Sequence, residues 1–278
     1  MELSVYSPVL VRNMYAEPEE AIKHARSLGI TAVEVFGNEL EKIALAEYQK
    51  YYSEYGIKIN GIVQGAYLSD PDADVRISEI DRVKKVVDLA AEYDVKHIMV
   101  APQLRRRGDV TQVQTMEDKM FVRDTIVNGM NEIVSYAKNS GVTLTLENFS
   151  THTHPFSTVS EMRYMLEHIP GLKYTLDAGN FYCVKEDVLG AYQQLKGYLY
   201  NMHIKDWVLD EFGYLIRPEL PALNGCVMGE GILPLAELLS VIKQDGFSGV
   251  MLLVVNTVVI TKQILEASVN FVNRGMGK

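Results

Sequence analysis

The sequence contains little of what several protein classes depend on. It has two cysteines, Cys183 and Cys226, in 278 residues. They supply no disulfide framework and no CxxC motif, so we expect a reduced, cytoplasmic setting. The longest apolar run, at residues 250–255, is far shorter than the ~20 residues that a membrane-spanning helix needs. The N-terminus lacks a basic region followed by an apolar stretch, so we expect neither a signal peptide nor a membrane partner.

Basic residues are also in short supply. Lys and Arg number 27 against 36 Asp and Glu, which gives a net charge of −9. Nucleic-acid binding depends on basic side chains that neutralise phosphates, so this balance argues against a nucleic-acid partner. The one dense basic run, at residues 105–107, is typical of a solvated loop or a subunit contact, and it leaves a homo-oligomer open.

Short apolar or β-branched runs alternate with helix-length segments from one end of the chain to the other. This alternation is typical of βα units and a parallel sheet. Eight such units in a chain of this length predict a (β/α)₈ TIM barrel, with residues 1–278 forming a single domain. We expect strands at residues 3–6, 31–36, 57–63, 97–101, 144–147, 174–177, 200–203 and 249–256.

Helix boundaries are marked by ordinary start and stop residues. Pro18 is followed by acids and predicts a first helical position, and Gly29 predicts the end of the same helix. Thr158 and Glu161 form a capping-box pattern. Helical spacing of apolar residues appears at Ile77, Ile80, Val83, Val87 and Ala90.

Three potential metal ligands follow successive expected strands. Glu147, Asp177 and His203 each stand at the C-terminal tip of a short apolar run. Because ligands bind outside the carboxyl ends of parallel strands, we expect these side chains to converge on one rim. Two carboxylates and one imidazole suit a divalent ion such as Mn²⁺, Zn²⁺ or Mg²⁺ with coordination positions left open. The alternative interpretation is that they are helix caps or loop charges.

Four short motifs occur in an order typical of a known family. They are LENFS at residues 146–150, LDAGN at 176–180, HIKD at 203–206 and GEGILP at 229–234. In these motifs the chain resembles the xylose isomerase-like sugar isomerase and epimerase family, in which a Glu, an Asp, a His and a final Glu hold one metal ion. The resemblance assigns the first three ligands to Glu147, Asp177 and His203. Val254 stands where the family has the fourth.

The resemblance implies a metal-dependent isomerase or epimerase acting on a small carbohydrate: a sugar, a sugar phosphate or a polyol ketone. Such a reaction removes a proton next to a carbonyl, with Glu147 as metal ligand and catalytic base. Val254 cannot accept a proton, so two-base epimerisation is blocked whereas a one-base 1,2-shift survives. We expect the metal to bind weakly. The alternatives are a noncatalytic sugar-binding barrel and an inosose dehydratase-like lyase.

Lys205 and Asn256 are further candidates near the same strand ends. Lys205 shares a strand face with His203, and we expect it to hold a substrate oxygen or the charge that develops there. A salt bridge between Lys205 and Asp206 is the alternative. Asn256 lies two residues beyond Val254 on the same side of the strand, where its carbonyl would contact metal or substrate, although a turn role is the more common one for Asn.

The remaining candidates would bind substrate. Asn180 stands where many relatives have a His. The connection at residues 207–232 is long enough to predict a substrate-covering loop, with Arg217 as a polar contact and Trp207 as a stacking surface or as an anchor of the loop. Glu34 is expected inside the barrel, where it would bind a ligand or pair with a buried base.

Overall fold

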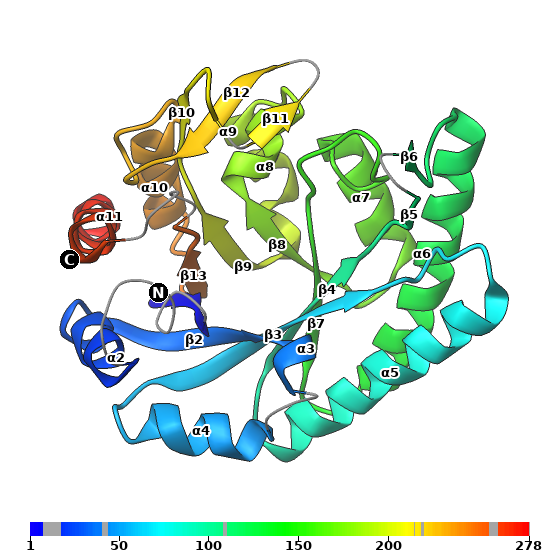
Figure 1. The fold of residues 1–278 in the computed structure, drawn as a ribbon, viewed down its shortest axis with the longest axis horizontal. Helices are drawn as coiled ribbons and strands as arrows, with labels where there is room; N and C mark the ends of the chain where they lie inside the picture. The colour runs from blue at the N-terminus through cyan, green and yellow to red at the C-terminus, as the bar shows by residue number, and fades with distance from the viewer. Residues whose placement is uncertain are drawn as a thin grey trace.

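The computed structural model describes residues 1–7, 18–40, 44–107, 110–213, 215–217, 220–255 and 261–277. Within these ranges eight parallel strands close into a barrel in the order β1-β13-β9-β8-β7-β4-β3-β2 (Figure 1). The barrel strands are β1 Glu2–Tyr6, β2 Ile30–Phe36, β3 Lys58–Ala66, β4 His97–Pro102, β7 Thr143–Glu147, β8 Lys173–Asp177, β9 Leu199–Ile204 and β13 Val250–Leu253.

Helices follow the strands and surround the barrel, which confirms the predicted (β/α)₈ architecture. The longer ones are α2 Pro18–Ser27, α4 Leu45–Ser53, α5 Ala73–Glu92, α6 Met116–Ala137, α7 Val159–His168, α9 Val188–Leu195, α10 Leu235–Gln244 and α11 Lys262–Met276. Shorter pieces are α3 Gly37–Leu40, α8 Ala178–Cys183 and η1 Lys196–Tyr198. None of these helices is long and apolar enough to cross a membrane.

Local sequence signals account for most helix boundaries. The predicted capping box is present, because the Glu161 backbone N–H donates to Thr158 Oγ1 and the Thr158 backbone N–H donates to Glu161 Oε2. Gly29 has φ 88°, a left-handed conformation that favours glycine. The predicted apolar face of α5 is too long at its start: Ile77 is 59% exposed, and the buried positions begin at Val83.

Side chains alternate between the two sides of the barrel wall. Ser4 pairs with Leu252, and Leu252 pairs with His203, so these three residues share one level of the interior. Their neighbours along the strands point outward and pack against the helices. Val254 lies two residues after Leu252, on the same strand face, and is buried. The strand alignment that predicts Val254 inside the barrel therefore matches the register.

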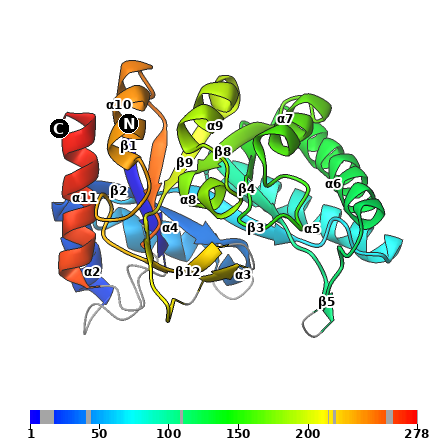
Figure 2. The same ribbon diagram turned by 90° about the horizontal axis from the view of Figure 1, so that it is seen from above.

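The long connection after β9 is more regular than predicted. Instead of an irregular loop it forms a small antiparallel sheet of β10 Trp207–Leu209, β11 Leu215–Arg217 and β12 Leu220–Gly225. The connection after β4 forms a hairpin of β5 Arg106–Arg107 and β6 Val110–Thr111. In Figure 2 the β5 hairpin, β12 and α3 all lie along the lower edge, where the carboxyl ends of the barrel strands emerge.

Candidate metal centre

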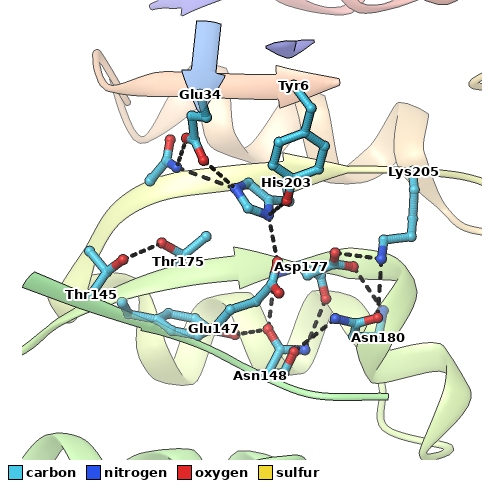
Figure 3. Close-up of polar contacts among 12 residues, drawn as sticks. Tyr6, Glu34, Thr145, Glu147, Asn148, Thr175, Asp177, Asn180, His203 and Lys205 are labelled. Atoms are coloured by element: carbon cyan, nitrogen blue, oxygen red, sulfur yellow. Dashed lines mark hydrogen bonds and ion pairs between the residues drawn. The ribbon is translucent and has the colours of Figure 1, made fainter. Parts of the chain in front are cut away.

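Glu147, Asp177 and His203 come from the ends of three adjacent strands, β7, β8 and β9, and they meet in space (Figure 3). One ligand atom from each lies within 4.8 Å of the others. His203 Nδ1 lies 2.5 Å from Glu147 Oε1. A divalent ion binds nitrogen and carboxylate oxygen at about 2.0–2.2 Å, so three ligand atoms within 4.8 Å of one another can surround a single ion once the short contact between His203 and Glu147 opens. The predicted convergence is therefore present.

Asn148 ties the first two ligand strands together. Its Oδ1 accepts hydrogen bonds from the Asp177 backbone N–H at 2.9 Å and from the Tyr174 hydroxyl at 2.7 Å. Its Nδ2 donates to the Asp177 backbone carbonyl at 2.9 Å. Asp177 in turn begins α8, because its Oδ1 accepts from the Asn180 backbone N–H. Asn148 thus fixes the backbone of Asp177, while the Asp177 carboxylate is itself oriented by its contact with the start of α8.

Lys205 faces Asp177 rather than its sequence neighbour. Its Nζ lies 2.7 Å from Asp177 Oδ2 and donates to Asn180 Oδ1 at 3.1 Å. The expected alternative, a salt bridge with Asp206, is therefore wrong. Burial lowers the pKa of Lys205, but the charges of Asp177 and Glu147 outweigh it, and the net pKa is raised. Lys205 is consequently a cation at neutral pH.

The pKa of Asp177 is also raised, but for a carboxylate this shift disfavours the charged form. Burial raises its pKa, Lys205 lowers it and Glu147 raises it again, with a net value of about 6. Its side chain is 1% exposed, whereas that of Glu147 is 15% exposed. Of the two carboxylates, Glu147 is the one that an incoming molecule can reach.

Asp206 organises the connection that follows β9. Its carboxylate accepts hydrogen bonds from the backbone N–H groups of Trp207, Gly229, Gly231 and Leu233. Trp207 is 2% exposed, and its Nε1 donates to the Gly179 carbonyl at 3.2 Å. In this geometry Trp207 anchors the connection to α8, and its ring is not an open stacking surface.

His203 lies between two carboxylates, of which Glu34 is the second (Figure 3). Its Nε2 is 3.4 Å from Glu34 Oε2, an ion pair without hydrogen-bond geometry. Asn201 Nδ2 donates to Glu34 Oε1 at 2.7 Å, and His97 Nδ1 lies 3.9 Å from the same oxygen. Of the two options for Glu34, pairing with a buried base is the one present.

The pKa values of this pair move in opposite directions. Burial lowers the pKa of His203, but the stronger opposing effect of Glu147 and Glu34 raises it to about 10. Burial raises the pKa of Glu34, and His203 with His97 and Asn201 lowers it below the usual value. The His203 imidazole is therefore protonated at neutral pH, and its positive charge lies between the two carboxylates.

Tyr6 also reaches the site, and sequence reasoning missed it. Its hydroxyl lies 3.2 Å from His203 Nδ1. Val5 pairs with Leu253, so continuing the register places Tyr6 beside Val254. Burial and nearby carboxylates raise the pKa of Tyr6 well above its usual value, so it is a neutral phenol. The alternation of side chains along β1 predicts that Tyr6 faces the barrel interior. The pairing of β1 with β13 is needed to show that Tyr6 lies next to His203 and Val254.

The other predicted substrate contacts are placed only in part. Asn180 is buried, and its Nδ2 donates to the Asn148 backbone carbonyl at 2.9 Å. Arg217 is the last residue of β11, and its side chain lies outside the described part of the structure. Asn256 also lies outside the described residues. The substrate-binding roles of these residues remain predictions.

Comparison with known proteins places the chain in a family. Residues 22–273 match the xylose isomerase-like TIM barrel family. No curated protein matches. Among solved structures, the IOLI protein with a bound zinc atom has 16% identity and a TM-score of 0.76, over 100% of this chain and 98% of that one.

Two further solved structures are similar over nearly their whole length. The probable 3-DHS dehydratase AsbF of Bacillus anthracis has 15% identity and a TM-score of 0.75, covering 97% of this chain and 98% of that one. D-psicose 3-epimerase of Clostridium cellulolyticum H10, solved with D-tagatose, has 17% identity and a TM-score of 0.72, covering 99% and 96%. At such identities these structures share the fold. The match over residues 22–273 goes further: the chain belongs to the xylose isomerase-like TIM barrel family.

Proposed function

We propose that this protein is a metal-dependent isomerase or epimerase that acts on a small sugar, sugar phosphate or polyol ketone by removing a proton next to a carbonyl. The observation that carries the proposal is the convergence of Glu147, Asp177 and His203 within 4.8 Å. They lie at the carboxyl ends of the barrel strands, where TIM-barrel enzymes have their active sites. The similar structures, a sugar epimerase and a zinc-bound protein, support the same class.

The three residues would hold Mn²⁺, Zn²⁺ or Mg²⁺ through a carboxylate oxygen of Glu147, one of Asp177, and His203 Nδ1. When bound, such an ion polarises a carbonyl oxygen and makes hydrogens on the neighbouring carbon more acidic. The fit rests on the donor set, because two carboxylates and an imidazole are ordinary ligands of these ions.

Glu147 is our candidate for the catalytic base. It is the more exposed of the two carboxylates, and it stands at the end of β7 beside the other ligands. Lys205 is our candidate for holding the substrate oxygen that gains negative charge. Two of its three N–H donors are used by Asp177 and Asn180, which leaves one for substrate.

A reaction on one face of the substrate fits this site better than proton exchange across two faces. Val254 offers no base, and its strand neighbour Tyr6 does not replace one, since its raised pKa keeps the phenol neutral and a poor proton acceptor. Lys205 is already protonated at neutral pH. Glu147 alone is enough for a 1,2-proton shift, which interconverts an aldose and a ketose.

Because Val254 supplies neither a metal ligand nor a base, it also favours a second candidate function, a noncatalytic sugar-binding barrel. Dehydration of a cyclic polyol ketone is a close variant of the first function, because it begins with the same proton removal. The similarity to a probable dehydratase supports keeping that substrate class in any screen.

The test is hydrogen exchange from D₂O into ketoses, ketose phosphates and cyclic polyol ketones, with Mn²⁺ at saturation. We expect exchange at the carbon next to the carbonyl, and a loss of about 10²–10⁴-fold in Glu147→Gln. Glu237→Gln, an exposed position on α10, is the control. Saturable sugar binding with no exchange in the wild-type protein would instead establish the binding barrel.

A further inference from the structure

Glu34 is a carboxylate in the barrel interior, where a buried charge is energetically unfavourable. Its side chain is fully buried inside the barrel. A buried carboxylate costs several kcal/mol unless it is paired and hydrogen-bonded. The proposed reaction does not use Glu34 directly, because the imidazole of His203 lies between it and Glu147 (Figure 3).

One carboxylate oxygen of Glu34 accepts a hydrogen bond, and the other faces His203. Asn201 Nδ2 donates to Oε1 at 2.7 Å. Oε2 has no hydrogen-bond partner among the described residues and lies 3.4 Å from His203 Nε2. Asn201 and His203 lie two residues apart on β9, so the strand that carries the metal-ligand candidate also carries the group that orients Glu34.

The contact with Glu34 influences which nitrogen of the His203 imidazole carries a proton. A neutral histidine has one N–H and one lone pair, and its partners choose which nitrogen carries which. Glu34 Oε2, a carboxylate oxygen, can only accept, so it favours a proton on Nε2. Asn201 Nδ2 also lies 3.5 Å from Nε2, but its shorter hydrogen bond, at 2.7 Å, goes to Glu34 Oε1. Glu147 Oε1 favours a proton on Nδ1 in the same way, but a metal ion that binds Nδ1 takes the place of that proton, and Glu34 then keeps the remaining proton on Nε2.

We propose that Glu34 is a positioning residue of the metal centre, which keeps His203 protonated at Nε2 with Nδ1 directed at the ion. It also adds a negative charge behind the imidazole, and so partly offsets the carboxylate that Val254 does not supply. This inference rests on the proposed metal-dependent function. A carboxylate in this position raises the basicity of a ligating histidine, and removing such a partner typically lowers metal affinity by about 10–100-fold.

The experiment measures metal affinity rather than activity. Mn²⁺ and Zn²⁺ are titrated into the wild-type protein and into Glu34→Gln, which keeps the shape of the side chain but removes its charge. We expect Glu34→Gln to bind about 10–100-fold more weakly. The control is Ser4→Ala, because Ser4 Oγ donates to Asn60 Oδ1 in the same interior, away from Glu34 and its partners. Ser4→Ala should bind metal like the wild-type protein.

A spectroscopic measurement separates positioning from a general loss of structure. In the Zn²⁺ protein labelled with ¹⁵N-histidine, the His203 signals are identified by their absence in His203→Gln. They should report a proton on Nε2 in the wild-type protein and lose that pattern in Glu34→Gln. If Glu34→Gln does not fold, Glu34→Asp takes its place, since it keeps the charge but withdraws the oxygen from Nε2.

The outcomes distinguish this inference from the function on which it rests. Asp177→Ala removes a proposed ligand, and if it still binds metal like the wild-type protein, the proposed site is wrong. If Asp177→Ala loses binding while Glu34→Gln stays within about twofold of the wild-type affinity, the metal site stands and the role of Glu34 is refuted. An equal loss in Ser4→Ala and Glu34→Gln also refutes it.

Discussion

The two sides of the barrel wall differ in chemistry. Outward-facing residues such as Val5, Ile62 and Leu253 are fully buried and pack with the helices in one apolar cluster. Inward-facing residues at comparable depth include Ser4 and His203, which carry polar groups and are equally buried. TIM-barrel interiors are dominated by branched apolar side chains, so the polar interior here is the unusual side. The outer layer stabilises the fold, and the interior holds the residues of the candidate metal centre.

We expect the largest change in metal affinity and exchange rate when a charged residue is introduced into the interior at Val254. Val254→Glu places an acid of suitable reach beside Tyr6, and a catalytic base typically contributes about 10²–10⁴-fold to rate. We expect tighter Mn²⁺ binding and new or faster exchange of deuterium from D₂O into a ketose. Val254→Gln controls for size without charge.

The opposite result at Val254 would be equally informative. Rapid exchange by the wild-type protein together with slower exchange by Val254→Glu would mean that Val254 belongs to a working site with different chemistry. The noncatalytic alternative would then be wrong.

A truncation on the outer side should affect stability alone. Ile62→Ala removes a fully buried side chain from β3, and such changes cost about 2–5 kcal/mol. We expect the free energy of unfolding in urea to fall by that amount, while Mn²⁺ affinity of the folded protein stays unchanged. A matching fall in affinity would show that the two sides of the wall are not separable.

The smallest effect is a graded dependence of metal binding on pH. His203 is protonated in the metal-free protein because its pKa is raised to about 10, and a metal ion must displace that proton. Between pH 7 and 9 the apparent association constant for Mn²⁺ should rise about tenfold per pH unit. Below about pH 6 the dependence should steepen, because Asp177, whose pKa is about 6, must also lose a proton.

Calorimetric titrations at several pH values check this dependence. A flat affinity between pH 7 and 9 would mean that His203 does not bind the ion through the nitrogen that Glu147 contacts.

Local patterns were sufficient to predict the barrel and the meeting of three side chains. Strand ends can be read from short apolar runs, and parallel strands bring their carboxyl ends to one edge. Glu147, Asp177 and His203 lie on adjacent strands, so their convergence needs only local order. Whether they hold a metal remains a prediction.

Long-range register explains what the sequence did not reveal. Tyr6 meets His203 because β1 closes the barrel against β13, and Glu34 meets His203 from β2, on the other side of that closure. No short motif encodes either contact. The small sheet after β9 was missed for a related reason, since its strands are short and pair only with one another.

The Asp206 carboxylate binds the backbone at both ends of the long connection, at Trp207 where it begins and at Leu233 where it ends. The two ends of this connection are therefore held together whatever its length. Closing a longer loop costs little, about 0.6 kcal/mol for each doubling. The connection between these two ends can consequently accept insertions at little cost in stability. This part of the rim can change while His203, on β9, and Lys205, the residue that follows β9, keep their positions.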